Sequence, residues 1–348
     1  GNSSLYVFSF MDEHAFVSKT KNISRAIRDN LGTEIVKLCQ NECGKSVDLS
    51  YSGETVQSNF KGIIPYMHPL EAATWLTNKA TTDLGMPFFL YASIHDQNLR
   101  LASLDVMLQQ PAWNKKIPFI FSPANTQAQE EGGDTTMQYF QVQTMKTSKL
   151  QNTLNQLMSG GIGSLYTVTD ISNGRTTAQH FSLESLLLKS SEKGLINYAK
   201  QNVYDASYKT PDIADVNIEG DHLHNTNAKI FHSVVSRGVY NDKKSIHDEV
   251  SPSMFLKKIE NLAFRNVIFK NMMDVTVPGP GFIASGGSVG DKIRINVLND
   301  DNNPESPDQL DQLKSGDFLI YNTRHTFRDT RHDVAMTVFK LEKGPNID

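Results

Sequence analysis

The segment TVPGPGFIASGGSVGDKIRINVL (Thr276–Leu298) constrains the fold more than any other part of the chain. Its five glycines and two prolines allow two interpretations, a phosphate-binding loop or a turn between strands. A phosphate-binding loop must lead into a helix, because the helix N-terminus supplies the N–H groups and the positive end of the dipole. The glycines instead lead into Lys292–Val297, where polar and apolar residues alternate as in a half-buried strand. The segment therefore predicts a strand, a long glycine turn and a second strand, and it argues against the P-loop and dinucleotide-binding folds.

The remainder of the chain predicts short strands interrupted by a few helices. Phe88–Ala92 and Leu99–Leu104 are interpreted as a strand pair, and Leu165–Ile171 and Thr177–Phe181 as a hairpin, because Asn-Gly lies between the last two. Further strands are predicted at Leu5–Phe10, Val47–Tyr51, Ile117–Phe121, Met137–Met145, Phe318–Asn322 and Val334–Leu341. Further helices are predicted at Ile35–Cys39, with Gly44 ending it, from Pro69, at Leu150–Met158 and from Ser251. Residues 190–250 are polar and weakly periodic. Without a strand–helix–strand rhythm, this pattern predicts an α+β protein built on antiparallel barrels or sandwiches.

Charge and hydropathy argue against several classes of protein. The net charge of −4 leaves no global basic field that would attract nucleic acid or an anionic membrane. No apolar run approaches the roughly 20 residues that a membrane-spanning helix needs, and Leu5–Phe10 lacks the preceding basic residue of a signal peptide. A length of 348 residues leaves room for about two or three domains.

The two cysteines, Cys39 and Cys43, lie four residues apart on a predicted helix, so their sulfurs share one face. They could supply half of a tetrahedral metal site, but no neighbouring histidine completes it. The preferred interpretation is a pair of buried, reduced thiols, since free cysteine packs as a small hydrophobe. Nothing in this spacing suggests a disulfide framework.

Two clusters of polar residues are candidate sites. His222 and His224, with Asp221 and His232 nearby, could begin a metal site, but exposed loop histidines are preferred because a metal site also needs outer partners. The segment RHTFRDTRHD (Arg324–Asp333) is either an anion site or a charged hairpin whose polar residues face water, and the hairpin is preferred.

A third cluster, Asn299–Asn303, looks like a calcium loop at first sight. An EF-hand needs glycine at its sixth position and glutamate at its twelfth. Counted from Asp300, these positions hold Glu305 and Asp311, so a solvated loop is preferred.

Other motifs add no site. Asn2-Ser3-Ser4 and Asn22-Ile23-Ser24 fit the glycosylation sequon, which arises easily by chance. Gly286–Gly290 matches G-x-S-x-G in its letters, but a predicted strand follows it where a nucleophile elbow needs a helix. The chain contains no H-E-x-x-H helix and no evident catalytic pair of carboxylates. We therefore predict no catalytic, cofactor-binding or metal-binding residues, no cofactor, and a protein that is not an enzyme.

Three groups of segments resemble, in their order along the chain, parts of one known family. The first is IIPYMHPLEAATWLTNKA (Ile63–Ala80) with FFLYASIHDQNLRLASLDVM (Phe88–Met107), a proline-led helix with a central tryptophan followed by a hairpin. The second is GGIGSLYTVTDISNGRT (Gly160–Thr176), and the third is the glycine-rich segment with SGDFLIYNTRHTF (Ser315–Phe327) and the last strand DVAMTVFKLEK. Their order is similar to that in the baseplate hub protein of contractile-tailed bacteriophages, a family related in architecture to the spike-hub proteins of type VI secretion.

This sequence departs from the family pattern at several places. Asp96–Asn98 stands in a hairpin turn where many relatives carry glycine, and the loop Asp300–Gln312 is long and acidic. The resemblance is weakest over residues 190–250.

The resemblance implies a hub-like fold of antiparallel β-barrel domains with inserted mixed α/β domains. Residues 1–12 would supply the last strand of an otherwise absent N-terminal barrel, and residues 13–112 an α+β insert domain. Residues 113–160 together with 271–348 would form the second β-barrel, and residues 161–270 a second insert domain.

The resemblance also implies a function. The chain would be a structural subunit of a phage tail baseplate hub, a trimeric, pseudo-sixfold ring that joins the tail tube to the central spike and lets DNA pass. Its partners would be further copies of itself and the spike, tail tube, tape measure and baseplate wedge proteins, with no stable membrane insertion. It would be located in the virion tail baseplate after assembly in the host cytoplasm. Alternatives from other classes are a tail-associated cell-wall hydrolase and a glycan-binding tail module.

Three expectations about residues follow. Trp75 is expected in the core, because it shares an apolar helical stripe with its neighbours. Gly279, Gly281 and Gly290 are expected to be structural, building turns at a barrel rim with no nucleotide nearby. Since lysine and arginine contacts dominate non-specific DNA affinity, basic residues should lie away from the ring lumen or be paired with carboxylates. These basic residues include Lys243, Lys244, Arg324, Arg328 and Arg331.

Overall fold

The computed structural model describes the chain in several separate ranges. They are residues 7–50, 52, 59–82, 84–93, 96–122, 138–147, 153–158, 160, 162–171, 174–192, 226–235, 260–262, 264–265, 268, 272–284, 287–298, 310–311 and 314–340.

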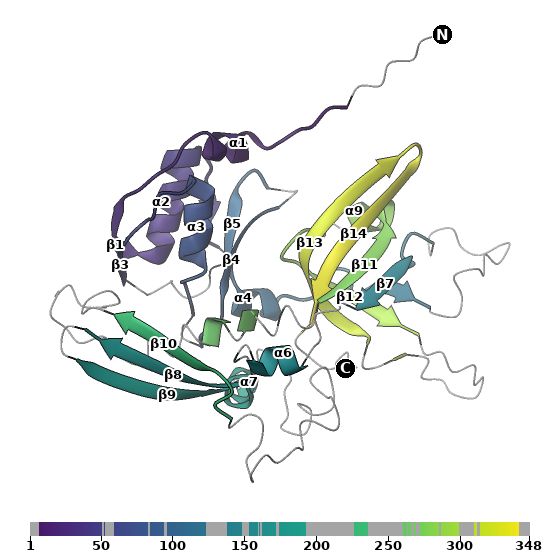
Figure 1. The fold of residues 1–348 in the computed structure, drawn as a ribbon. Coiled ribbons are helices and arrows are strands. Elements are labelled where there is room, and N and C mark those ends of the chain that lie inside the picture. The colour runs from purple at the N-terminus through teal and green to yellow at the C-terminus, as the bar shows by residue number, and fades with distance from the viewer. Residues whose placement is uncertain are drawn as a thin grey trace.

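Two helices packed against each other form the core of the N-terminal part (Figure 1). Asn30 caps α2 by accepting a 2.8 Å hydrogen bond from the N–H of Gly32, and Gly44 ends α2 with a φ of 67°. Pro69 begins α3, where the missing N–H of proline leaves no hydrogen bond unmade. The elements are α1 (Glu13–Lys19), β1 (Ala26–Asn30), α2 (Leu31–Cys43), β3 (Asn59–Ile63), which pairs antiparallel with β1, and α3 (Pro69–Thr77). Their buried apolar side chains include Ile35, Leu38, Cys39, Ala72, Ala73 and Leu76.

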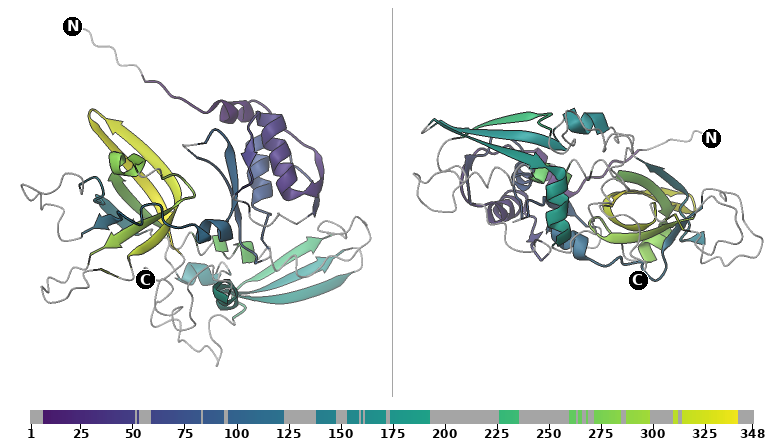
Figure 2. Two further views of the ribbon diagram at one scale, coloured as in Figure 1. Left: turned by 180° about the vertical axis from the view of Figure 1, so that it is seen from behind. Right: turned by 90° about the horizontal axis from the view of Figure 1, so that it is seen from below.

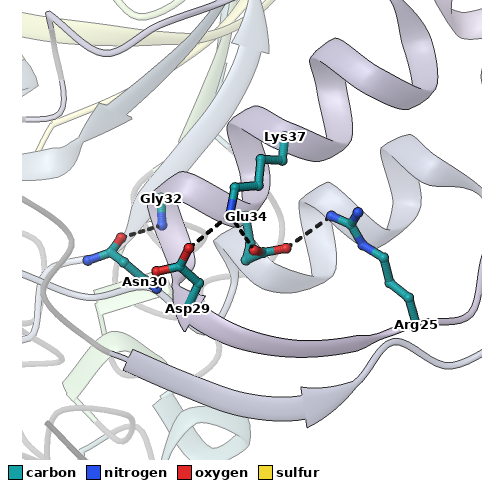
Figure 3. A network of polar contacts seen from close by, with 6 residues as sticks. All are labelled: Arg25, Asp29, Asn30, Gly32, Glu34 and Lys37. Carbon is teal, nitrogen blue, oxygen red and sulfur yellow. Dashed lines mark hydrogen bonds and ion pairs between the residues drawn. The ribbon is translucent and has the colours of Figure 1, made fainter. Parts of the chain in front are cut away.

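A polar network connects β1 and Arg25, the residue before it, to the first turns of α2 (Figure 3). Glu34 accepts a hydrogen bond from Nη2 of Arg25 at 3.0 Å and from Nζ of Lys37 at 3.1 Å. Lys37 also donates to Oδ2 of Asp29 at 2.8 Å. The carboxylate of Glu34, which is nearly buried, is thus balanced by two cations that are partly exposed.

A three-stranded sheet follows, in the order β2-β5-β4. It is formed by β2 (Val47–Asp48), β4 (Phe88–Ala92) and β5 (Leu99–Ser103), with α4 (Leu104–Gln109) continuing directly from β5. Strands β4 and β5 pair antiparallel, with Phe88 opposite Ser103.

A second three-stranded sheet has the order β10-β8-β9. Strands β8 (Gly163–Asp170) and β9 (Arg175–Ser182) form a hairpin, and β10 (Ile230–Val235) lies parallel to β8. Gly174 precedes β9 with a φ of 68°, a backbone conformation that favours glycine. Helices α6 (Thr153–Met158) and α7 (Leu183–Glu192) flank the hairpin in the sequence.

The largest sheet has six strands in the order β6-β12-β13-β14-β11-β7 and is nearly closed into a barrel. Ile120 of β6 forms a bridge with Gln141, just before β7, so the two edge strands approach each other. Figure 2 shows this barrel-like sheet end on in its right-hand view. Its elements are β6 (Phe119–Phe121), β7 (Thr144–Thr147), β11 (Met272–Pro278), α9 (Gly279–Ala284), β12 (Lys292–Val297), β13 (Gly316–Arg328) and β14 (Arg331–Phe339). Its interior is filled by apolar side chains that include Phe119, Val275, Val277, Ile293, Ile295, Phe318 and Val334.

The α+β class predicted from the sequence is confirmed, with one nearly closed, barrel-like sheet among the described residues. The hairpin around Gly174 and the strand pair β4–β5 lie where the sequence predicts them. The helix that ends before Gly44 and the helix that begins at Pro69 are also confirmed. The hub-like arrangement and the domain boundaries stay predictions.

The glycine-rich segment needs a correction. A six-residue helix, α9, follows β11 directly, where the sequence predicted only a turn. Pro280 is the second residue of α9, and proline favours the first turn of a helix, so the proline outweighs the neighbouring glycines there. Strand β12 forms as predicted.

Two predicted strands are wrong in part. Val7–Phe10, the described part of the predicted strand Leu5–Phe10, forms no strand, because it pairs with no described residue and its side chains point to solvent. Within Met137–Met145, only Thr144 and Met145 belong to a strand, β7, because the ladder with β11 begins at Thr144. Met137 lies outside the described residues.

Trp75 is half-buried rather than part of the deep core. It packs against the cluster of α2 and α3, and Nζ of Lys79 lies 4.4 Å from the centre of its ring. The apolar stripe of the helix was predicted correctly, but Trp75 lies at the edge of that stripe, where one side of the ring meets a lysine instead of a second apolar layer.

Candidate functional site

Only one residue of the candidate histidine cluster near position 222 lies within the described ranges. Asp221, His222 and His224 lie outside the described residues, whereas His232 is exposed on β10. Within the described ranges, no group of three or more histidine, cysteine, aspartate or glutamate side chains is placed to hold a metal ion. Asn2 and the acidic segment Asn299–Asn303 also lie outside the described residues, and Asn22 is exposed.

The two cysteines are buried, reduced thiols, as predicted. Burial in the α2–α3 core raises the pKa of Cys39 to about 12. Burial also raises the pKa of Cys43. Because the thiolate is the reactive and metal-binding form, neither cysteine is poised for chemistry at neutral pH.

The hairpin formed by β13 and β14 is the best candidate for a functional surface. It extends beyond the rest of the barrel-like sheet (Figure 1) and turns at Asp329, which has a φ of 49°. Cross-strand pairing sets Phe327 opposite His332 and Arg328 opposite Arg331. Since side chains alternate between the two faces of a strand, the hairpin has an aromatic face and a basic face.

The aromatic face is a stack of rings. The rings of Phe327 and His332 lie 4.1 Å apart at 10°, and those of His332 and His325 lie 5.3 Å apart at 23°. Nδ1 of His325 and Nε2 of His332 are 3.1 Å apart, so one of them carries the shared proton. His332 also packs against Gly279, because a Cβ on this glycine would lie 1.8 Å from Nδ1 of the histidine. The beginning of α9 is therefore covered by protein.

His325 is the titratable group that this stack affects most clearly. Burial lowers the pKa of His325, and the neighbouring His332 lowers it further. Its Nε2 is buried and has no hydrogen-bond partner among the described residues. A second proton on this ring would therefore be neither solvated nor paired.

The basic face carries three exposed arginines, Arg324, Arg328 and Arg331. Arg331 donates to Asp333 at 3.0 Å and to Gln143 at 3.2 Å. Burial raises the pKa of Asp333, but hydrogen bonds from Gln143 and Arg331 outweigh burial and lower it overall. In the described part of the chain, no carboxylate pairs with Arg324 or Arg328. The charged hairpin predicted from the sequence is confirmed, and two of its cations are free to meet a partner.

A second exposed surface lies before α1. Val7, Phe8, Phe10 and Met11 are each at least 66% exposed, and Phe10 is 93% exposed. Figure 1 shows this arm leading away from α1 and from the sheets. The sequence pattern identified the apolar residues but assigned them to a strand, because periodicity cannot show whether a partner strand exists.

Comparison with known proteins gives only distant similarities. No family model matches the chain, and no curated protein matches it. Among the solved structures that are similar to the chain, two align with 94% of it. One is the 43 kDa tail protein of prophage MuSo2 from Shewanella oneidensis, at 13% identity, a TM-score of 0.41 and 71% of that chain. The other is a tail protein from Neisseria meningitidis MC58, at 10% identity, a TM-score of 0.43 and 72% of that chain. Scores this low carry no argument about the fold or the function of this chain.

Proposed function

We propose that the chain is a structural subunit of a bacteriophage tail and that it acts by assembly rather than by catalysis. The observation that carries this proposal is the arm before α1, whose apolar side chains are exposed side by side. Contiguous exposed apolar residues mark surfaces that contact another protein. An exposed apolar arm of this kind fits a subunit whose neighbours in an assembly cover these side chains.

The identity of the assembly rests on the resemblance found in the sequence. The segments that carry it coincide with ordered elements: α3 with β4 and β5, then β8 and β9, and finally β11 to β14. In finer detail, the subunit would form a trimeric, pseudo-sixfold baseplate hub between the tail tube and the central spike. The spike, tail tube, tape measure and wedge proteins would contact its outer and end surfaces in the virion.

The free arginines of the hairpin restrict how such a ring could be built. Arg324 and Arg328 would hold a passing DNA duplex by its phosphates if they faced the lumen. The hairpin is therefore expected to point away from the lumen, toward an acidic surface of a protein partner. Lys243 and Lys244 lie outside the described residues.

Electron microscopy of the purified chain tests this proposal. Particles with threefold symmetry and a central opening are the expected result. A variant with Phe8→Ser and Phe10→Ser should lose these particles while keeping its circular dichroism spectrum, because both side chains are exposed and leave the folded core unchanged. Tyr66→Ser, which removes an aromatic side chain that is 77% exposed and lies outside both the arm and the hairpin, is the matched control. Rings that persist unchanged without the arm aromatics would contradict the role given to the arm. Particles without threefold symmetry would contradict the hub.

A further inference from the structure

A cavity of about 640 Å³ opens between three of the four sheets, those that contain β4, β8 with β10, and β13. Its walls come from α3 and β4, from β8 and β10, from Asn261, Leu262 and Arg265, and from β13. Five of the thirteen lining residues are phenylalanine or tyrosine: Phe88, Phe89, Tyr166, Phe231 and Tyr321. This volume lies within the usual range of small-molecule sites, and concave apolar walls are typical of such sites.

Among the described residues, one arginine, Arg265, lines this cavity. Its Nε donates to Oδ1 of Asn261 at 2.9 Å, and its Nη2 donates to the carbonyl oxygen of Phe88 at 2.8 Å. Asn261 is itself fixed, because its Nδ2 donates to the carbonyl oxygen of Ala80 at 2.9 Å. The guanidinium group also lies 5.1 Å from the centre of the Phe89 ring. These contacts hold the guanidinium in one orientation.

The charge of Arg265 is not balanced within the described part of the chain. Its two described hydrogen bonds go to a neutral amide and a neutral carbonyl, and no described carboxylate forms an ion pair with it. Glu260, five residues earlier, lies 3.7 Å from Lys189 instead. Burial lowers the pKa of Arg265 to about 10, although the nearby Tyr321 opposes this change. A guanidinium has five N–H donors, so donors remain for a further acceptor.

From this arrangement, we infer that the cavity binds a carboxylate carried on an apolar body, with the carboxylate on Arg265 and the body against the aromatic walls. A fixed guanidinium matches the two oxygens of a carboxylate by parallel hydrogen bonds, and such charge-assisted pairs are the stronger kind. A partly buried cation without a described counter-charge is stabilised by an anion that binds beside it.

The walls favour a carboxylate over a phosphate group. Apart from Arg265, no lysine or arginine is found among the described residues that line the cavity, and His232 is the only other basic side chain there. A phosphate dianion would bring more negative charge than one guanidinium balances, whereas a carboxylate brings a single charge. The carboxylate could come from a small molecule or from an acidic side chain of a partner protein, and the two sources are separable by experiment.

Calorimetric titration of the full chain tests the inference with two probes. The first is phenylacetate, with phenylacetamide as its uncharged match. The second is a capped tripeptide with glutamate between two leucines, with the glutamine tripeptide as its match. Saturable binding of at least one acidic probe below about 10 mM is expected, with its neutral match at least about tenfold weaker. Tighter binding of phenylacetate indicates a small-molecule ligand, and tighter binding of the tripeptide indicates an acidic segment of a partner.

A variant at Leu262 tests whether Arg265 is the group that binds the carboxylate. It lines the cavity, is 45% exposed and lies three residues before Arg265, so a change there leaves the contacts of Arg265 to Phe88 and Asn261 in place. Leu262→Glu should abolish binding, because a carboxylate at this helical spacing pairs with the guanidinium itself. Leu262→Gln, of nearly the same shape as the glutamate variant and without charge, should still bind the acidic probe, at least about tenfold more tightly than Leu262→Glu does. The inference is overturned if neither acidic probe binds, if the neutral probes bind equally well, or if Leu262→Glu binds like Leu262→Gln.

Discussion

At the scale of single residues, Glu34 connects the segment before β1 to α2. Its carboxylate holds both Arg25 and Lys37 (Figure 3), and Nε of Arg25 is already buried without a partner. Glu34→Gln would leave Arg25 with a neutral acceptor at a nearly buried position. We expect a loss of about 1–2 kcal/mol in the free energy of unfolding, measured in urea, since the cations are partly exposed and water compensates them. Glu71→Gln, which breaks the exposed pair with Lys19, is the control and should leave the urea midpoint unchanged. Equal effects of the two substitutions would contradict this account.

His325 makes stability depend on pH. Its pKa in the folded chain lies below the ordinary value of 6.5, so the unfolded chain binds the proton first as the pH falls. Stability therefore falls as the pH drops below about 6.5, until the folded histidine is also protonated. The rings that pack against it are those of His332 and Phe282.

The measurement is the melting temperature of the native chain and of His325→Phe between about pH 7.5 and pH 5. The phenylalanine ring keeps the stack but takes up no proton. The melting temperature of the variant should therefore fall less than that of the native chain across this interval. Curves that stay parallel would show that His325 does not contribute.

At the scale of elements, the sequence predicted what depends on neighbouring residues in the chain and missed what depends on distant ones. The end of α2 at Gly44, the start of α3 at Pro69 and the hairpin at Gly174 each follow from a local backbone preference. Strand β10 was missed, because its partner β8 lies about 65 residues earlier and no local pattern indicates a parallel pairing.

The candidate surfaces divide in the same way. The charged hairpin Arg324–Asp333 was visible as a run of polar residues between two apolar runs. The cavity around Arg265 was not visible, because its walls come from segments between positions 74 and 321 and only the fold brings them together.

Gly281 of α9 offers a test at this scale. A Cβ at this position would lie 2.0 Å from the carbonyl oxygen of Tyr139, which is a backbone atom and cannot turn aside. Gly281→Ala should therefore lower the free energy of unfolding by about 1–3 kcal/mol, measured in urea, despite the higher helix propensity of alanine. Ile283→Ala on the same short helix is the control and should change it by less than about 1 kcal/mol, since Ile283 is exposed. A stabilised Gly281→Ala variant would contradict the close approach of Tyr139.

At the scale of the whole molecule, the described chain has two exposed surfaces whose side chains are suited to contact another protein. One is the apolar arm before α1, and the other is the hairpin with its free arginines. No helix in the described ranges is long and apolar enough to cross a membrane. Both surfaces fit a subunit whose neighbours cover them, which is the central claim of the proposed function.

The solution mass of the chain, measured by light scattering during gel filtration, tests that claim most directly. A trimer would have three times the chain mass of 38.9 kDa. We predict this mass for the native chain and the single-chain mass for the variant with Phe8→Ser and Phe10→Ser. A native chain that stays at 38.9 kDa over the whole concentration range would contradict the claim that it is an assembly subunit held together by its arm.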